Sequence, residues 1–132
     1  MTALEVSLRV WGDAPEVAEL AALTVGTAWV RGDRVPGSPV MLRKEGGWEV
    51  FSALRSDRSL EDHVTSLLEA TASVWPHLVH ASKSGYVELS VAIYVSADPQ
   101  PIARLTRAQL LSLAELGADI DLDIFNWTLV QE

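Results

Sequence analysis

The chain has 132 residues and no cysteine. A disulfide, a thiolate nucleophile and a zinc site with sulfur ligands are therefore excluded. No apolar run approaches the roughly 20 residues that a membrane-spanning helix needs. The first ten residues also lack the basic and apolar blocks of a secretory signal. We therefore expect a cytoplasmic protein that makes no contact with a membrane.

Basic residues are scarce as well. The chain has 10 Lys and Arg against 18 Asp and Glu, and its net charge is −8. Because binding to phosphates depends on clustered Lys and Arg, we expect no nucleic-acid partner. An acidic surface keeps a protein soluble, and it also speeds the encounter with a basic partner. Both interpretations of the acidity stay open.

The common catalytic motifs are absent too. We find no dinucleotide-binding or phosphate-binding glycine loop, no nucleophile elbow and no zinc-protease helix, and no nucleophile is visibly paired with a base. His77 and His80 are three residues apart, but a metal site needs three or four converging ligands. We expect His63 to have a structural role. The sequence thus predicts no enzyme and no cofactor, and the histidines indicate no metal site.

The clearest periodicity lies between Ser59 and Trp75. Apolar residues at Leu60, Val64 and Leu67 follow the spacing of a helix with one buried stripe. Such a helix covers something flat, which indicates a sheet beneath it. Proline is tolerated in the first turn of a helix and not in its interior, so we expect a break and a second helix from Pro76 to Lys83.

Alternating apolar and polar residues indicate strands elsewhere in the chain. Proline at a first turn and a Thr-x-x-Gln capping pattern indicate further helices. The predicted strands are Leu4–Trp11, Thr24–Val30, Trp48–Leu54, Tyr86–Val95 and Asp119–Phe125; the further helices are Pro15–Leu23 and Thr106–Gly117; the connections are a loop over Arg31–Pro39 and a linker at Asp98–Pro101.

This order, βαββαβαβ, predicts a single domain of the α+β class. We expect a two-layer sandwich in which helices cover one face of a mostly antiparallel five-stranded sheet. The first six elements match a ferredoxin-like βαββαβ core, and the final helix and strand are an addition to it. We expect the other face of the sheet to be open to solvent.

Several segments together resemble a known family. They are the RGD loop, Gly47-Trp48 with Ser52 in the strand that follows, LEDHVTSLL, and LTRAQLLSLAELGADIDLDIF. The chain resembles the bacterial family called domain of unknown function 4279 from Val6 to Phe125, although a Tyr is more usual at Phe125. The resemblance implies a small stand-alone bacterial domain without an established activity. Some small domains of this type resemble immunity proteins of toxin systems.

The last strand carries Asp119, Asp121 and Asp123 on one face, with neighbours about 7 Å apart. We expect its aliphatic residues to face inward, namely Ile120, Leu122 and Ile124. A calcium loop has the same start, but it needs glycine where Ile124 stands and glutamate where Val130 stands, so we reject that motif. Three interpretations of the row stay open: a solvated face, a docking surface for a basic partner, and a metal site.

The strand alternation also places aromatic residues among these acids. Phe51 shares the face opposite the helices with Glu5, Arg9 and Glu49. Large aromatic side chains supply contact area at low entropic cost, which is typical of protein-binding surfaces. Alternatively, the face packs against a second copy or under the tail from Asn126 to Glu132. The residues predicted to bind a partner are Trp11, Glu88, Tyr94, Asp119, Asp121, Asp123 and Phe125.

We therefore expect a non-enzymatic protein-binding domain, in its narrower form an immunity or antitoxin-like inhibitor of a basic toxin. The alternative is a small-molecule-binding or accessory metabolic domain with a cavity lined by Trp29, Trp48 and Trp75. An anionic small molecule held by the arginines of the Arg31–Pro39 loop is a further hypothesis. A structural homodimer is the last.

Overall fold

The computed structural model describes residues 3–95 and 103–126. The predicted linker at Asp98–Pro101 and the tail beyond Asn126 lie outside the described residues. The elements, in chain order, are β1 (Ala3–Trp11), α1 (Pro15–Ala18), η1 (Glu19–Ala22), β2 (Thr27–Trp29), β3 (Gly47–Phe51), α2 (Leu60–Thr71), η2 (Ala72–Val74), α3 (Trp75–Ser82), β4 (Tyr86–Val95), α4 (Arg107–Glu115) and β5 (Asp119–Asn126).

The five strands form one sheet in the order β2-β3-β1-β4-β5. The pairs β2–β3, β3–β1 and β1–β4 are antiparallel, and β5 runs parallel to β4. The prediction of a mostly antiparallel sheet is confirmed, and the sheet is mixed because α4 returns the chain to the end where β4 began. The order β2-β3-β1-β4 is the ferredoxin-like core, and β5 extends it.

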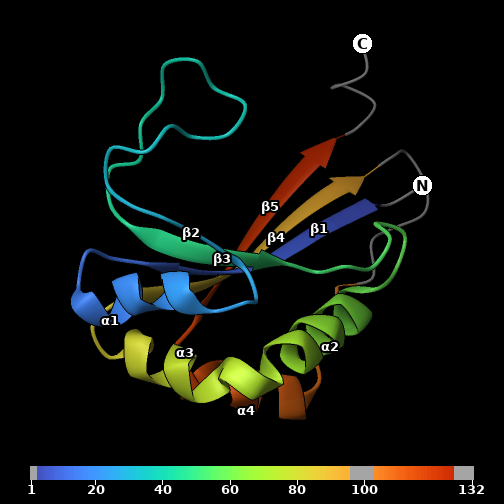
Figure 1. Cartoon of the computed structure of the whole chain (residues 1–132). Coiled ribbons are helices and arrows are strands. Elements are labelled where there is room, and N and C mark those ends of the chain that lie inside the picture. The colour runs from blue at the N-terminus through green and yellow to red at the C-terminus, as the bar shows by residue number, and fades with distance from the viewer. Residues whose placement is uncertain (1–2, 96–102, 127–132) are drawn as a thin grey trace.

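The helices all lie on one side of the sheet, as Figure 1 shows. The connection between β2 and β3 rises on the opposite side. The core fills the space between the two layers, and its most buried side chains include Val10, Trp48, Val64, Leu78 and Val91. The predicted two-layer α+β sandwich is therefore confirmed, with one face of the sheet left open by the helices.

α2 buries the stripe that its periodicity predicts, namely Leu60, Val64 and Leu67. The Ser59 side chain caps the helix by accepting a hydrogen bond from the Asp62 amide at 3.1 Å. The break before α3 comes earlier than predicted. It is a 3₁₀ turn at Ala72–Val74, so that Pro76 falls in the first turn of α3, where its missing N–H costs nothing.

β2 is shorter than the predicted strand Thr24–Val30. Gly26 has a φ of +80°, which bends the chain just before the strand begins. The Trp48 indole packs against Gly26, and its Nε1 donates a hydrogen bond to the Val25 carbonyl at 3.0 Å. Residues 24–26 therefore cover a core tryptophan instead of pairing with β3.

Two other elements are also shorter than predicted. β3 ends at Phe51 instead of Leu54, because Ser52 turns toward α2. The first helix is a four-residue α-helix followed by a 3₁₀ turn that ends at Ala22. Val17 and Leu20 are the residues of this segment that are buried.

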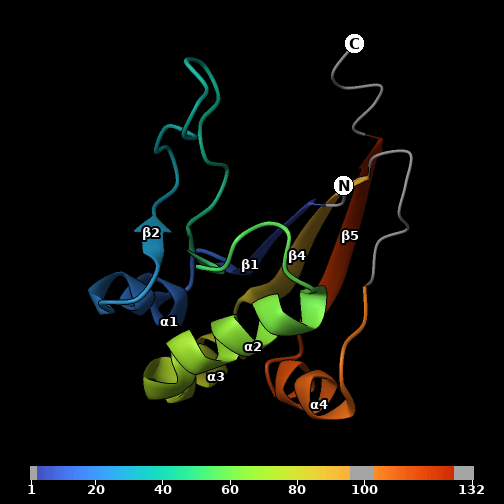
Figure 2. The same ribbon diagram turned by 90° about the vertical axis from the view of Figure 1, so that its right-hand side faces the viewer.

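β5 differs from the expectation in burial. The β4–β5 register places its three aliphatic residues on the helix side of the sheet, as predicted. The helix layer does not cover them, however, and Figure 2 shows β5 rising beyond α4 at the margin of the molecule. The exposed fractions are 39% for Ile120, 50% for Leu122 and 67% for Ile124.

Candidate functional site

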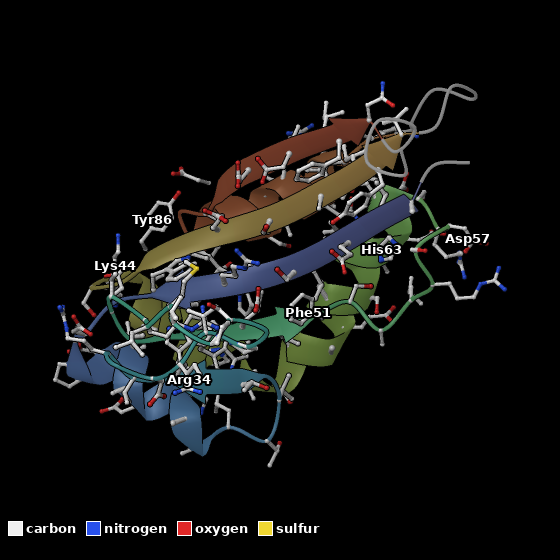
Figure 3. All side chains as sticks on the ribbon, turned by 90° about the horizontal axis from the view of Figure 1, so that it is seen from above. Arg34, Lys44, Phe51, Asp57, His63 and Tyr86 are labelled. Carbon is white, nitrogen blue, oxygen red and sulfur yellow. The ribbon has the colours of Figure 1, made fainter. Side chains whose placement is uncertain are left out.

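We use the name open face for the side of the sheet opposite the helices. All seven residues predicted to bind a partner lie on it. Figure 3 looks onto this face, on which Phe51 and Tyr86 are labelled. The strand register places Glu88 between Arg9 and Asp119, and Tyr94 beside Phe125. The acidic residues are therefore neighbours, whereas Trp11 lies at one end of the face and the Tyr94–Phe125 pair lies at the other.

The open face is strongly acidic. The five strands contain six acidic residues and one basic residue, Arg9, which leaves a net charge of −5 on them. All six carboxylates lie on the open face, because the register gives them the same side of the sheet. The acidic residues are Glu5, Glu49, Glu88, Asp119, Asp121 and Asp123.

One of these carboxylates is neutralised locally. The Ser7 hydroxyl donates a hydrogen bond to Glu49 Oε2 at 2.9 Å, and Arg9 Nε donates to the same oxygen. The Glu49 side chain is only 12% exposed. Arg9 is thereby engaged by Glu49, and its guanidinium also lies 6.0 Å from the centre of the Trp11 ring. Arg9 is the only basic residue in the five strands, so the strands supply no second cation for the other five carboxylates.

The pKa values of the acidic residues record this crowding. Partial burial raises the pKa of Glu88, and the charge of Asp121 acts in the same direction, against Arg9. Desolvation by neighbouring side chains raises the pKa of Asp121, and a hydrogen bond and the charge of Asp123 add to the effect. A positive group placed over this part of the open face therefore meets carboxylates whose negative charge is poorly compensated.

Tyrosine side chains orient two further carboxylates. The Tyr86 hydroxyl donates a hydrogen bond to Asp119 Oδ2 at 2.8 Å, and this bond is the main reason that the pKa of Tyr86 rises to about 12. The Tyr94 hydroxyl lies 3.4 Å from Glu5 Oε2, and its ring stacks on Phe125 with centroids 5.2 Å apart. The aromatic residues therefore hold acidic groups in place as well as offering apolar contact area.

At its β2 end the open face carries a stack that the sequence analysis missed. The Trp29 ring meets Trp11 edge-on at 5.5 Å, and the Arg43 guanidinium lies 3.9 Å from the Trp29 centroid. Gly47 permits the stack, since a Cβ there would lie 2.5 Å from the Trp29 ring. The alternation of residues in β2 could have indicated that Trp29 lies on the open face. Arg43 lies in a loop, where no periodic pattern indicates the direction of its side chain.

The proposed cavity between three tryptophans is not formed. Trp48 is fully buried on the helix side of the sheet, whereas Trp29 lies on the open face. Trp75 is elsewhere, at the start of α3, and its Nε1 donates to Glu115 at 2.8 Å. The suggested cavity with these three residues as its lining was therefore wrong.

A different cavity, of about 380 Å³, lies at the β2 edge between the first helix and the following loop. Its lining includes Ala18, Ala21 and Trp29. Two of the residues that line it, Arg31 and Asp13, form an ion pair. The hydrogen bond from the Gly46 amide lowers the pKa of Asp13, and Arg31 acts in the same direction. Arg31 is therefore engaged with a carboxylate, which weakens the hypothesis that it holds an anion.

The structure also pairs a hydroxyl with an imidazole, which the sequence did not reveal. His63 Nδ1 lies 2.7 Å from Ser52 Oγ, and Ser52 Oγ also accepts a hydrogen bond from the Leu54 amide. His63 is 1% exposed, and its Nε2 makes no hydrogen bond of normal geometry. Burial lowers the pKa of His63. The pair fastens the chain after β3 to α2, as expected for a structural histidine.

Metal-binding geometry is not found among the described residues. No group of three or more His, Asp or Glu side chains in residues 3–95 and 103–126 is arranged to hold an ion. The carboxylates of Asp119, Asp121 and Asp123 form a row along β5 and do not converge on a point. His77 and His80 are both exposed on α3. Of the interpretations of the aspartate row, the solvated face and the docking surface are the ones that this arrangement favours.

Within the described part of the chain no helix is long and apolar enough to cross a membrane.

Comparison with known proteins gives one match. No curated protein and no solved structure matches the chain. Residues 2–127, however, match a protein family whose members share no assigned activity in its description. The chain belongs to this family, Domain of unknown function (DUF4279), over nearly its whole length.

Proposed function

We propose that this protein is a non-enzymatic binding domain whose open face engages a basic protein. The observation that carries the proposal is the charge distribution of the sheet, in which the strands place six carboxylates and one arginine on the face that the helices leave uncovered. The loop residue Arg43 adds a second arginine only at the β2 end of that face. Charge of one sign gathered on one surface steers a partner of the other sign and raises the association rate.

Apolar contact area lies beside this charge. Phe51 is 59% exposed, Tyr86 is 48% exposed and Phe125 is 41% exposed, all on the open face. Exposed aromatic side chains next to charged groups are typical of protein interfaces, where they supply affinity while the charges supply rate and specificity. The combination supports a protein partner more than a small inorganic cation.

The narrower form of the proposal is an inhibitor that covers the basic surface of a toxin, in the manner of an immunity protein or antitoxin. Enzymes that act on nucleic acids carry clustered Lys and Arg at their binding surfaces. A rigid acidic sheet is complementary to such a surface. The partner would then be neutralised by occupation of its substrate-binding groove, without a chemical step on either protein.

The test uses a defined cationic probe, a capped octalysine peptide, and titration calorimetry at two salt concentrations. The triple variant D119N/D121N/D123N is compared with the wild type. We expect the variant to bind about tenfold more weakly at roughly 0.05 M salt, and to lose less affinity than the wild type when the salt is raised. The reason is that these three charges face the bound lysines directly.

The matched control removes the same number of charges from the helix layer. Glu19, Glu61 and Glu69 lie there, outside the sheet. The variant E19Q/E61Q/E69Q should retain most of the affinity for octalysine. If the two triple variants lose affinity equally, net charge alone explains the binding and the open face has no special role.

A second candidate function is the binding of a small molecule in the cavity at the β2 edge. The cavity volume of about 380 Å³ lies in the range of natural ligand sites, and Trp29 with small alanine residues lines it. Native mass spectrometry of the purified protein distinguishes this function from the first, since a bound metabolite adds a fixed mass. The variant Ala21→Phe, which fills the cavity, should abolish that added mass and leave octalysine binding unchanged.

A further inference from the structure

The outer edge of β5 is long and regular. Its eight residues pair with β4 without interruption, from Glu88 opposite Asp119 to Val95 opposite Asn126. β5 is the last strand in the sheet order, and no strand in the described part of the chain pairs with its other edge. Such an edge presents alternate N–H and C=O groups that are ready to pair with another strand.

One face of β5 offers an apolar strip to that strand. Ile120, Leu122 and Ile124 lie 39%, 50% and 67% exposed, so exposure rises along the strand. Their neighbours on β4 in the same rows are buried almost completely by the helices. A further strand beside β5 would extend the same apolar layer and remove these three side chains from water.

The other face of β5 decides which strand fits. Asp119, Asp121 and Asp123 stand there at every second residue. Side chains in facing positions of neighbouring strands lie about 5 Å apart, so a second copy of β5 would bring two rows of aspartates together. That repulsion opposes a homodimer through this edge, and a strand with Lys or Arg at every second residue turns it into attraction.

We propose that β5 accepts a strand from the basic partner, in which aliphatic residues alternate with Lys or Arg. This inference rests on the proposed function and specifies how the partner is held. The main chain of the incoming strand pairs with the outer edge of β5 along residues 119–125. Its aliphatic side chains cover Leu122 and the two isoleucines, and its cationic side chains lie over the aspartates.

The test compares two capped peptides of 8 residues, the length of β5. Both contain four lysines and four valines; one alternates them, and the other has them in two blocks. Fluorescence anisotropy gives the affinities, and amide hydrogen exchange by NMR gives the protection of residues 119–126. We expect the alternating peptide to bind at least about tenfold more tightly and to slow the exchange of alternate β5 amides.

The double variant L122N/I124N should reduce the preference for the alternating peptide to less than about threefold, because the apolar strip is lost. The matched control, L110N/L111N, changes two exposed leucines of α4 and should keep the preference. Both variants retain all three aspartates, so a change in the preference reports on the apolar strip and not on charge.

The other results each have a definite meaning. If both peptides bind equally and β5 amides stay unprotected, strand addition is overturned while the acidic open face stands. If neither peptide binds at low salt, the proposed function falls as well. If only a chain shortened by residues 127–132 binds, or if the protein alone dimerises with protected β5 amides, the edge is occupied by its own tail or by a second copy, and the inference is wrong.

Discussion

The two edges of the sheet are built differently. β2 has three residues and lies between two glycines with positive φ, Gly26 at +80° and Gly32 at +91°. β5 has eight residues, no glycine and no proline, and all eight are exposed. The β2 edge is therefore short and bent. The β5 edge is long and pairs with β4 without interruption, and it carries aspartates on one face and aliphatic residues on the other.

The difference teaches how each edge avoids unwanted pairing. Short or strongly bent edges are poor templates for another strand, so β2 needs no charge for protection. β5 is a good template, and it is guarded by a row of aspartates that repels copies of itself. Protection by charge is selective, because a strand of the opposite charge can still pair with this edge.

The largest effect is expected at Gly47, which lies in tight contact with Trp29 on the β2 side. In Gly47→Ala the new Cβ would lie 2.5 Å from the Trp29 ring and 2.7 Å from the Val10 carbonyl oxygen. We expect a loss of about 3 kcal/mol in the free energy of unfolding, measured by urea denaturation. Gly37→Ala, where nothing lies within 4 Å, should lose about 1 kcal/mol from its positive φ alone. Equal losses would contradict the packing argument.

The second prediction concerns His63, whose burial makes the free energy of unfolding depend on pH. The pKa of His63 is lowered in the fold from the ordinary 6.5, mainly by burial, so the unfolded chain binds the proton more readily. Its contribution is complete above pH 6.5 and is lost as the pH falls toward the folded value, at no more than about 1.4 kcal/mol per pH unit. Urea denaturation at several pH values should show a shallower loss in His63→Gln. The exposed His80→Gln should follow the wild type, and a common slope in all three proteins would exclude His63 as the cause.

The next effect concerns the capping box of α4, the helix that precedes β5 in the chain. Thr106 Oγ accepts a hydrogen bond from the Gln109 amide at 3.1 Å, and Gln109 Oε1 accepts one from the Thr106 amide at 3.0 Å. Thr106→Ala should lower the free energy of unfolding by about 1 kcal/mol. Thr106→Ser keeps the acceptor and should lose much less. A loss of the same size in both variants would show that the methyl group, and not the cap, is what matters.

The smallest effect is expected on the apolar strip of β5. Leu122→Ala should cost about 0.5 kcal/mol, because the side chain is 50% exposed. Leu89→Ala, on the same side of the sheet but 1% exposed in β4, should cost about 3 kcal/mol. Thermal or urea denaturation of the two variants decides the matter. Similar losses would mean that the apolar strip of β5 is covered in solution, in contradiction to the strand addition proposed above.

Much of the fold follows from the sequence because alternation depends only on local geometry. The side of the sheet on which each strand residue lies was predicted correctly for β1, β3, β4 and β5. The expected burial of Ile120, Leu122 and Ile124 was wrong, because these residues are exposed. Burial depends on where the helices end relative to the sheet. Periodicity identifies the side of a residue, and only tertiary packing determines whether that side is covered.

The candidate site divides in the same way. The acidic row and its aromatic neighbours were predicted from strand parity, and they lie on one face. The Arg43–Trp29 contact and the Ser52–His63 pair were missed. In each pair one residue, Arg43 or Ser52, lies in irregular backbone, where no repeating pattern constrains the direction of a side chain.

The central position of β1 sets the order in which the protein assembles. β1 is the first strand of the chain, and Ala3 lies opposite Tyr94, so the main pairing of the sheet closes a loop that spans most of the sequence. Closing so long a loop is slow because its entropic cost precedes the contacts that offset it. β5 pairs with the strand immediately before α4, which is a far shorter excursion. The transition state for folding should therefore contain β1 paired with β4, whereas the pairing of the acidic strand β5 with β4 closes at a much lower entropic cost.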